Sequence, residues 1–254
     1  MRSRPPAAAP FSAPTRSRRP ARALACALLL LAGALVPPAL GAGEKAAPSL
    51  PAGVPPVDRA RIEKVLAKAT VSTRVEIEPY PLRLDVFDYL LDHPDFATQV
   101  TRSLKLSRYR IWRTADGLNL DDGWGATGLI TPLYGDGGLR VAYARGRYEQ
   151  GFLPDISGQA VIMLHYAGGP GPSGRPALAT SLDVFAQLDS AMVATFAGSL
   201  AKSKATEEGL YVLKVFSRLS GHLERRADEV LAELGRRPEV SRPELDGFRK
   251  LLGR

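Results

Sequence analysis

The sequence contains few of the residues from which metal sites and covalent nucleophiles are usually built. Its 254 residues include one cysteine, three histidines, three methionines and two tryptophans. The cysteine, Cys26, lies in the N-terminal segment, so the chain beyond it can form no disulfide bond and no cysteine-based metal site. No serine stands in a G-x-S-x-G motif and no H-E-x-x-H motif is present. These absences exclude two common hydrolase signatures.

The three histidines do not form a recognisable ligand set. His93, His165 and His222 fall in different predicted elements, and no two of them are four residues apart. A metal site needs three or four ligands that converge in space, so we expect neither a metal nor a cofactor. We expect His93 in a turn, whereas His165 shares a predicted strand with Val161 and Met163 and is the histidine best placed to point into a cavity.

The positive charge of the chain is concentrated at its N-terminus. The net charge is +8 and the pI is near 9.8, values that often indicate a nucleic-acid partner. The first 41 residues contain six of the 34 basic residues and none of the 26 acidic ones, which leaves 28 basic and 26 acidic residues, a net charge of +2, for the remainder. We therefore expect no nucleic-acid partner.

The N-terminal segment has the order of a secretory signal. Arginines precede the apolar run ALACALLLLAGALV, and small residues follow it. We expect residues 1–42 to be a signal peptide, cleaved after Gly41 or Ala42, and the protein to be exported to the periplasm or outside the cell. An uncleaved membrane anchor is the alternative. Residues 43–56, rich in proline and alanine, are expected to form a linker.

The remainder alternates between helical and strand periodicity. Residues 57–69 predict a helix with Ile62 and Val65 on one face, and 71–77 predict a strand. Residues 84–104 predict two short helices separated at Asp92-His93-Pro94, because the residue before a proline resists helical geometry. Residues 105–167 predict a meander of strands with turns between them, among them DGLNLDDG (116–123).

The C-terminal half predicts a strand followed by a long helix. Apolar residues alternate from Thr180 to Leu188, and from residue 193 they recur at helical spacing to Leu234. The polar stretch KSKATEEG (202–209) interrupts the apolar stripe and is expected to bend or end the helix. The loop GPGPSG (169–174) fits a phosphate-binding pattern literally, but its prolines remove N–H donors and a strand follows, so we interpret it as a hairpin loop.

Two stretches resemble the START-like superfamily, which includes the Bet v 1 and polyketide-cyclase proteins. DVFDYLLDHPDFATQV resembles the helix pair after that superfamily's first strand, and SLDVFAQLDSAMVATFAGSLAKS resembles its last strand and long helix. The resemblance implies an α+β helix-grip fold over residues 57–235, with 236–254 as a C-terminal tail. In that fold a curved antiparallel sheet wraps around a long C-terminal helix, a short helix pair follows the first strand, and the cavity usually binds apolar ligands.

Strand alternation, together with this resemblance, suggests which residues line a cavity. The candidate ligand-binding residues are Tyr109, Ile111, Tyr143, Arg145, Ile162, Leu164, His165 and Phe196. Arginines interleaved with aromatic residues in 108–148 could hold a phosphate or carboxylate head group, or could lie on a solvated outer face of the sheet.

We expect the protein to bind a lipid or another hydrophobic small molecule, with possible contact at a membrane surface; the sequence leaves its oligomeric state open. A cyclase or hydrolase on the same scaffold is one alternative, which would place a convergent acid/base pair in the cavity. A non-catalytic envelope protein is the other. It would present the apolar stripe of 210–234 to a protein partner.

Overall fold

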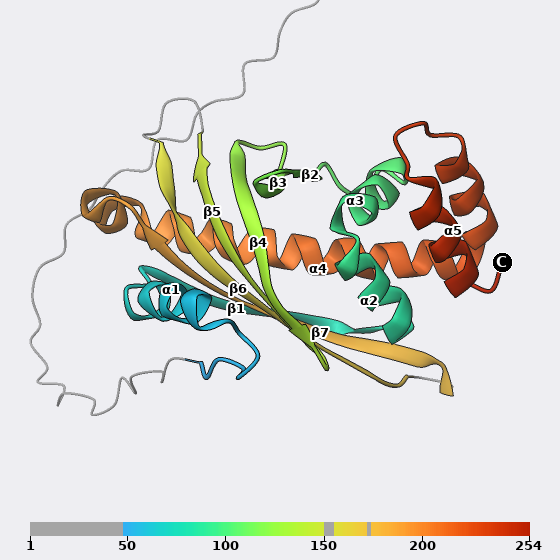
Figure 1. The fold of residues 1–254 in the computed structure, drawn as a ribbon, viewed down its shortest axis with the longest axis horizontal. Helices are drawn as coiled ribbons and strands as arrows, with labels where there is room; N and C mark the ends of the chain where they lie inside the picture. The colour runs from blue at the N-terminus through green and yellow to red at the C-terminus, as the bar shows by residue number, and fades with distance from the viewer. Residues whose placement is uncertain (1–47, 150–154, 172–173) are drawn as a thin grey trace, which may run out of the picture. The chain divides into compact units, whose positions relative to one another are not determined.

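The computed structural model describes residues 48–149, 155–171 and 174–254, without the side chains of 191–198. The predicted signal peptide and the start of the predicted linker lie outside the described residues. Within these ranges the chain is an α+β protein with one antiparallel sheet and a long helix near its C-terminus (Figure 1). In chain order the elements are α1 (Pro56–Ala67), β1 (Val71–Tyr80), α2 (Leu84–Asp92), α3 (Pro94–Ser103), β2 (Arg110–Thr114), β3 (Gly117–Asp121), β4 (Ala126–Asp136), β5 (Leu139–Tyr148), β6 (Ile156–Pro170), β7 (Pro176–Leu188), α4 (Ala191–Gly235) and α5 (Arg242–Leu251).

The seven described strands form one sheet in the order β1-β7-β6-β5-β4-β3-β2. Strands β2 to β7 are a meander in which each strand pairs with the next, and β1 pairs with β7 at the far edge. Every neighbouring pair is antiparallel, as the turn signals between short alternating runs predict. The helix pair α2–α3 follows β1, and its break at His93 confirms the predicted one.

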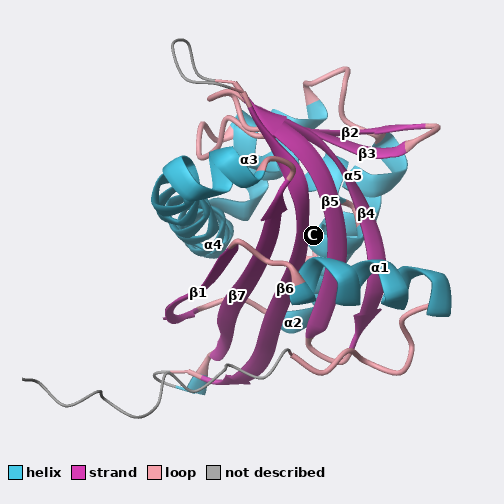
Figure 2. Ribbon diagram, turned by 90° about the vertical axis from the view of Figure 1, so that its left-hand side faces the viewer, coloured by secondary structure: helices cyan, strands magenta, loops and turns pink. Residues whose placement is uncertain are grey.

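Helices cover both faces of the sheet, α1 on one and α4 on the other (Figure 2). Ile62 and Val65 of α1 are fully buried against Val141 and Val161 of the sheet, which confirms the predicted apolar face of this helix. On the opposite face Leu213 of α4 packs with strand residues that include Ile162 and Leu164. Successive strand residues therefore face different helices.

The long helix does not break where the sequence suggested. The polar stretch 202–209 is helical throughout, and the backbone departs from helical geometry at Arg226 instead (φ −153°, ψ 47°). The predicted interruption at KSKATEEG is wrong, because lysine, alanine and glutamate are strong helix formers and their polarity changes only what the helix faces.

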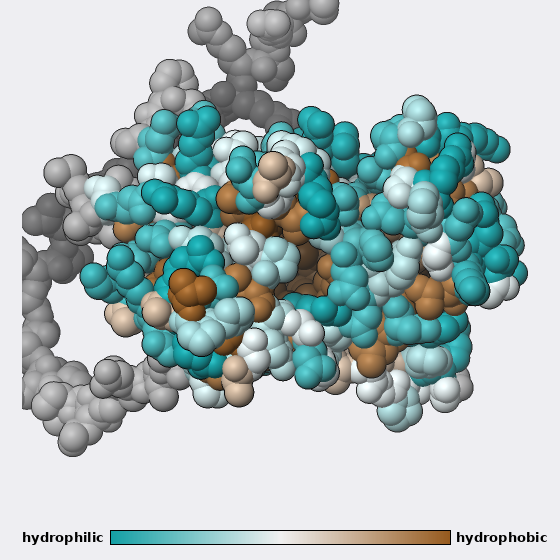
Figure 3. Space-filling model, in the orientation of Figure 1, coloured by the Kyte–Doolittle hydropathy of each residue, from teal (hydrophilic) through white to brown (hydrophobic). Residues whose placement is uncertain are grey.

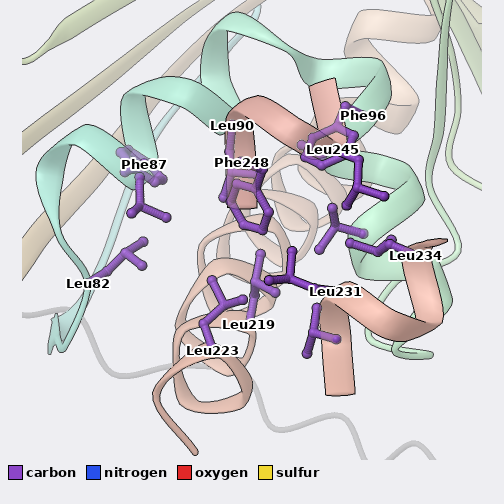
Figure 4. Close-up of a cluster of buried hydrophobic side chains, with 14 of the residues drawn as sticks. Leu82, Phe87, Leu90, Phe96, Leu219, Leu223, Leu231, Leu234, Leu245 and Phe248 are labelled. Atoms are coloured by element: carbon purple, nitrogen blue, oxygen red, sulfur yellow. The ribbon is translucent and has the colours of Figure 1, made fainter. Parts of the chain in front are cut away.

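A second correction concerns residues 236–254, which we expected to be a tail. They contain α5, whose Leu245 and Phe248 are buried in the largest core cluster with Leu90, Phe96 and Leu234 (Figure 4). This cluster joins α2, α3, α5 and the second half of α4. The few apolar residues of α5 recur at helical spacing, which is enough to bury one side of a short helix.

A third correction concerns residues 116–123, which we interpreted as a turn. Most of this segment is β3, with Leu118 and Leu120 on one face and Asn119 and Asp121 on the other. The alternation of apolar and polar residues is visible in the sequence, but it covers only four residues between a glycine and an aspartate, which are both typical of turns. Leu118 is buried, and the turns lie before the strand, at Ala115 and Asp116, and after Asp121.

Hydrophilic side chains cover most of the face shown in Figure 3, and hydrophobic ones appear between them in small patches. None of the described helices combines the length and the hydrophobicity needed to span a membrane.

Candidate functional site

A cavity of about 300 Å³ lies between the sheet and the first half of α4. Strands β3 to β7 contribute its floor, and α4 contributes its roof. Further along the same sheet face, the larger side chains of Ile162, Leu164 and Leu182 pack beneath α4. The cavity therefore begins where the strand side chains become small.

Two rows of small residues form the floor of the cavity. In one row Gly128 of β4 lies opposite Gly146 of β5, which in turn lies opposite Gly158 of β6. Residues directly opposite one another in antiparallel strands project from the same face. A parallel row of alanines, Ala144, Ala160 and Ala186, runs beside the glycines across β5, β6 and β7, and all six residues line the cavity.

The roof is one face of α4. Leu200, Lys204 and Glu208 are spaced four residues apart, and Ala201 and Ala205 lie beside them; all five line the cavity. The polar stretch that seemed to interrupt the helix thus places one lysine and one glutamate over an otherwise apolar space.

Polar groups gather at one end of the cavity, around Glu208. Nζ of Lys204 lies 2.7 Å from Oε1 of Glu208, and the hydroxyl of Tyr109 donates a hydrogen bond to Oε2 of the same carboxylate. The ammonium also lies 5.8 Å from the ring centroids of Trp124 and Tyr148, within the range of a cation–π interaction. Both carboxylate oxygens of Glu208 are therefore occupied.

The rings of Tyr109, Trp124 and Tyr211 form a mutually packed group beside these charges, with centroid distances of 5.3 to 6.2 Å. Asp122, which follows β3 and is 2% exposed, also lines the cavity. The polar end thus holds two carboxylates and one ammonium, and the three packed rings lie beside it without being part of the lining.

The surroundings of Tyr109 and Lys204 keep the hydroxyl and the ammonium protonated at neutral pH. Burial raises the pKa of Tyr109 far above its usual range, and the hydrogen bond to Glu208 raises it further. The hydrogen bond to Glu208 raises the pKa of Lys204 and outweighs the lowering caused by burial. Tyr109 stays neutral and Lys204 stays charged, so both remain hydrogen-bond donors.

The structure does not bring the eight candidate ligand-binding residues together around one cavity. Ile162 and Leu164 are on the cavity's face of the sheet but pack under α4 beyond it. The backbone of Ile111 contacts the hydroxyl of Thr98 in α3, and Tyr109 lies at the polar end through its bond to Glu208. Phe196 belongs to α4, in the part whose side chains are not described.

The other three candidates lie on the sheet face opposite α4. Tyr143 is buried beneath α1, with the guanidinium of Arg61 4.2 Å from its ring centroid. Arg145 is among the residues that line the cavity, but strand alternation directs its exposed side chain to the same face as Tyr143. Nε2 of His165 lies 3.1 Å from Oδ2 of Asp183 on that face.

The arginines of 108–148 likewise do not converge. Arg145 and Arg147 are exposed, and Arg147 pairs with Glu149. Arg140 forms ion pairs of 2.9 Å with Asp88 and with Asp92 of α2, away from the cavity. This arrangement fits the solvated-face alternative better than a shared anion site.

The other two histidines have structural partners. Nδ1 of His93 lies 3.0 Å from Glu244 of α5, at the junction of α2 and α3. His222 accepts a hydrogen bond from Arg226 at the break in α4; burial and the charges of Arg226 and Arg225 lower its pKa. Among the described side chains, no group of three or more His, Cys, Asp or Glu is arranged to hold a metal ion.

Sequence reasoning missed Asp122, Lys204, Glu208 and the six small floor residues. The floor residues were signalled by glycine and alanine at alternate positions of β5 and β6, but only the strand register shows that small residues from four strands meet. In comparisons with models of protein families and with curated proteins, the chain matches none of them, so its function has to be inferred from the cavity itself.

Proposed function

We propose that this protein binds a hydrophobic small molecule or lipid in the cavity between the sheet and α4, as an exported protein with a helix-grip fold of the START-like kind. The observation that carries the proposal is the double row of glycine and alanine beneath the helix. A hollow of about 300 Å³ that is open on one side and lined largely by apolar residues has the usual form of a small-molecule site.

The lining favours an apolar occupant. Apart from the polar end, the side chains that strand alternation directs to this face of the sheet are aliphatic or absent, whereas polar residues of the lining such as Gln159 and Gln187 stand at the alternate positions. Burial of apolar ligand surface contributes about 25 cal/mol per Å². The volume falls at the lower end of the range of about 300–1,000 Å³ that is typical of small-molecule sites, which suits a slender ligand.

The pKa shifts at the polar end favour binding over acid/base catalysis. A general acid or base works best with a pKa near the operating pH. The pKa values of Tyr109 and Lys204 are both shifted upward, away from neutrality. Lys204, whose ammonium keeps further N–H groups beyond the one that meets Glu208, is suited to hold a ligand by donating a hydrogen bond, whereas the single O–H of Tyr109 is already donated to Glu208.

The alternative of a protein partner on the apolar stripe of 210–234 has less support. Leu213, Leu219, Leu223 and Leu234 are at most 8% exposed and pack against the sheet or against α2, α3 and α5. These leucines are buried in contacts within the chain, so their apolar surface is not available to a partner helix.

Filling the cavity tests the proposal. Ala160→Leu adds three carbon atoms to the centre of the floor, whereas Ala167→Leu makes the same change at an exposed position of the same strand. We expect the parent protein and the Ala167→Leu variant to bind a neutral naphthylamine dye that fluoresces in apolar surroundings, and Ala160→Leu to weaken binding at least about tenfold, a loss of about 1.4 kcal/mol. Equal dye binding by all three proteins, or none by the parent, would contradict the proposal.

A further inference from the structure

A second hollow, of about 620 Å³, lies where the C-terminal end of α3 and the segment that leads to β2 meet α4 and the residues that follow it. In contrast to the cavity beneath α4, all of its lining residues except Leu106 are polar or charged. Its charged residues are Arg102, Lys105, Arg108, Arg218, Arg237 and Glu239. Five cations and one carboxylate give this basic hollow a formal charge of +4.

The positive charge of the basic hollow is largely unpaired. Arg237 lies 2.9 Å from Glu233 and 3.5 Å from Glu239, so the one carboxylate of the lining already has a partner. The side chains of the other four cations make no ion pair or hydrogen bond with a described residue, although most other described arginines pair with an aspartate or a glutamate. Arg108 lies only over the Trp124 ring, 5.5 Å from its centroid. All four are exposed, so a ligand can reach them from solvent.

One of these cations, Lys105, occupies a backbone position that normally favours glycine. Helix α3 ends in a Schellman motif, in which the N–H of Leu106 bonds to the carbonyl oxygen of Thr101 (2.9 Å) and the N–H of Lys105 to that of Arg102 (3.0 Å). Lys105 has a φ of 56°, and it is the one non-glycine residue with a positive φ in the described part of the chain. A side chain costs free energy in this conformation, so stability alone does not explain a lysine here.

The end of α3 accounts for only part of the cluster. A helix C-terminus carries a partial negative charge that favours nearby cations, and this applies to Arg102 and Lys105. Arg108 belongs to the segment before β2, and Arg218 lies in the interior of α4. Like charges that share one hollow repel each other, so the gathering of all four calls for an anion between them.

We infer that the basic hollow binds a phosphate monoester group. Such a group carries a charge of about −1.5 to −2 and three strong acceptor oxygens, whereas a carboxylate offers one charge and two oxygens. Arginine side chains match phosphate particularly well, because their fork of N–H groups can bond to two oxygens at once. The inference goes beyond the proposed function, since this site is separate from the apolar cavity and can be filled without it.

Two small dianions test the preference for phosphate. Methyl phosphate and malonate are titrated calorimetrically into the protein at about pH 8, where phosphate monoesters are dianionic. We expect methyl phosphate to bind at least about tenfold more tightly than malonate. Equal binding of the two would overturn the inference, because it would show attraction of any anion without recognition of phosphate.

Removing two cations from the hollow locates the site. We expect the double variant Arg102→Gln/Arg218→Gln, which alters one residue in each of two helices, to bind methyl phosphate at least about tenfold more weakly. The matched control, Lys64→Gln/Lys68→Gln, removes the same charge from exposed positions at the end of α1, on the other side of the sheet (Figure 2). It should bind as the parent does. Equal weakening in both double variants would overturn the inference.

Lys105→Gly separates binding from stability. Glycine relieves the left-handed backbone, so we expect this variant to unfold at a higher urea concentration than the parent and yet to bind methyl phosphate more weakly. Weaker binding by a more stable protein cannot result from damage to the fold. A variant that binds methyl phosphate as tightly as the parent would contradict the place of Lys105 in the site.

Vesicles distinguish the source of the phosphate group. Phosphatidylcholine vesicles with and without phosphatidic acid, whose head group is a phosphate monoester, are floated with the protein. Recruitment by phosphatidic acid that Arg102→Gln/Arg218→Gln abolishes would identify a lipid head group, and binding of methyl phosphate without recruitment would identify a soluble phosphorylated molecule. Neither binding nor recruitment overturns the inference. Dye binding in the apolar cavity is measured separately, so failure here leaves the proposed function standing.

Discussion

The backbone of β7 lies directly against Gly158, one of the glycines in the cavity floor. A Cβ atom added to Gly158 would lie 2.5 Å from the carbonyl oxygen of Gln187 and 3.3 Å from Cα of Leu188. The same holds for Gly146, whose Cβ would lie 2.5 Å from the oxygen of Thr127. The glycines therefore serve two purposes, since they permit close strand approach and leave the floor of the cavity hollow.

Gly158→Ala should destabilise the protein, although alanine is usually the better residue in a strand. We expect the free energy of unfolding to fall by about 1–3 kcal/mol, because the neighbouring strand has to move away. The measurement is urea denaturation, with Gly169→Ala on the same strand as the control, since nothing lies within 4 Å of a Cβ at Gly169. Equal stability of the two variants would show that the approach of β7 does not require glycine.

Helix α5 is an integral element of the core. Phe248 is fully buried, with its ring centroid 5.4 Å from that of Phe96 and 5.9 Å from that of Tyr89. Tyr89 also donates a hydrogen bond of 2.6 Å to the carbonyl oxygen of Glu244. The helix thereby ties the helix pair α2–α3 to the second half of α4.

Removing the side chain of Phe248 tests this role. We expect Phe248→Ala to lower the free energy of unfolding by about 3–5 kcal/mol, as is usual for a buried phenylalanine. Lys250→Ala on the exposed side of the same helix should change it by less than about 0.5 kcal/mol. A loss below about 1 kcal/mol for Phe248→Ala, measured by urea denaturation, would favour the original interpretation of residues 236–254 as a tail.

At the scale of elements, the sequence predicted those whose pattern is long or clearly punctuated. The helix with Ile62 and Val65, the helix break at His93 and the strand ending at Leu188 were all visible as periodicity or turn chemistry. Strand β3 and α5 were missed because each offers only two or three apolar residues. The break in α4 at Arg226 has no proline or glycine to signal it.

At the scale of the whole molecule, the cavity depends on register, which no single segment encodes. Gly128, Gly146 and Gly158 look unremarkable in their own strands and form a row only when β4, β5 and β6 pair as they do. The residues chosen from sequence were all large and half of them aromatic, and large side chains fill space. Of the residues chosen from sequence, only Arg145 is among those that line the cavity, and Tyr109 reaches its polar end through Glu208.

The central claim is that this cavity holds an apolar molecule. The most direct measurement is native mass spectrometry of the whole chain produced in an export-competent host, followed by analysis of the released molecule. We predict one bound amphiphile per chain, lost on denaturation, present in Ala167→Leu and absent from Ala160→Leu. A parent protein that carries no bound molecule and takes up none when offered decanol would contradict the claim.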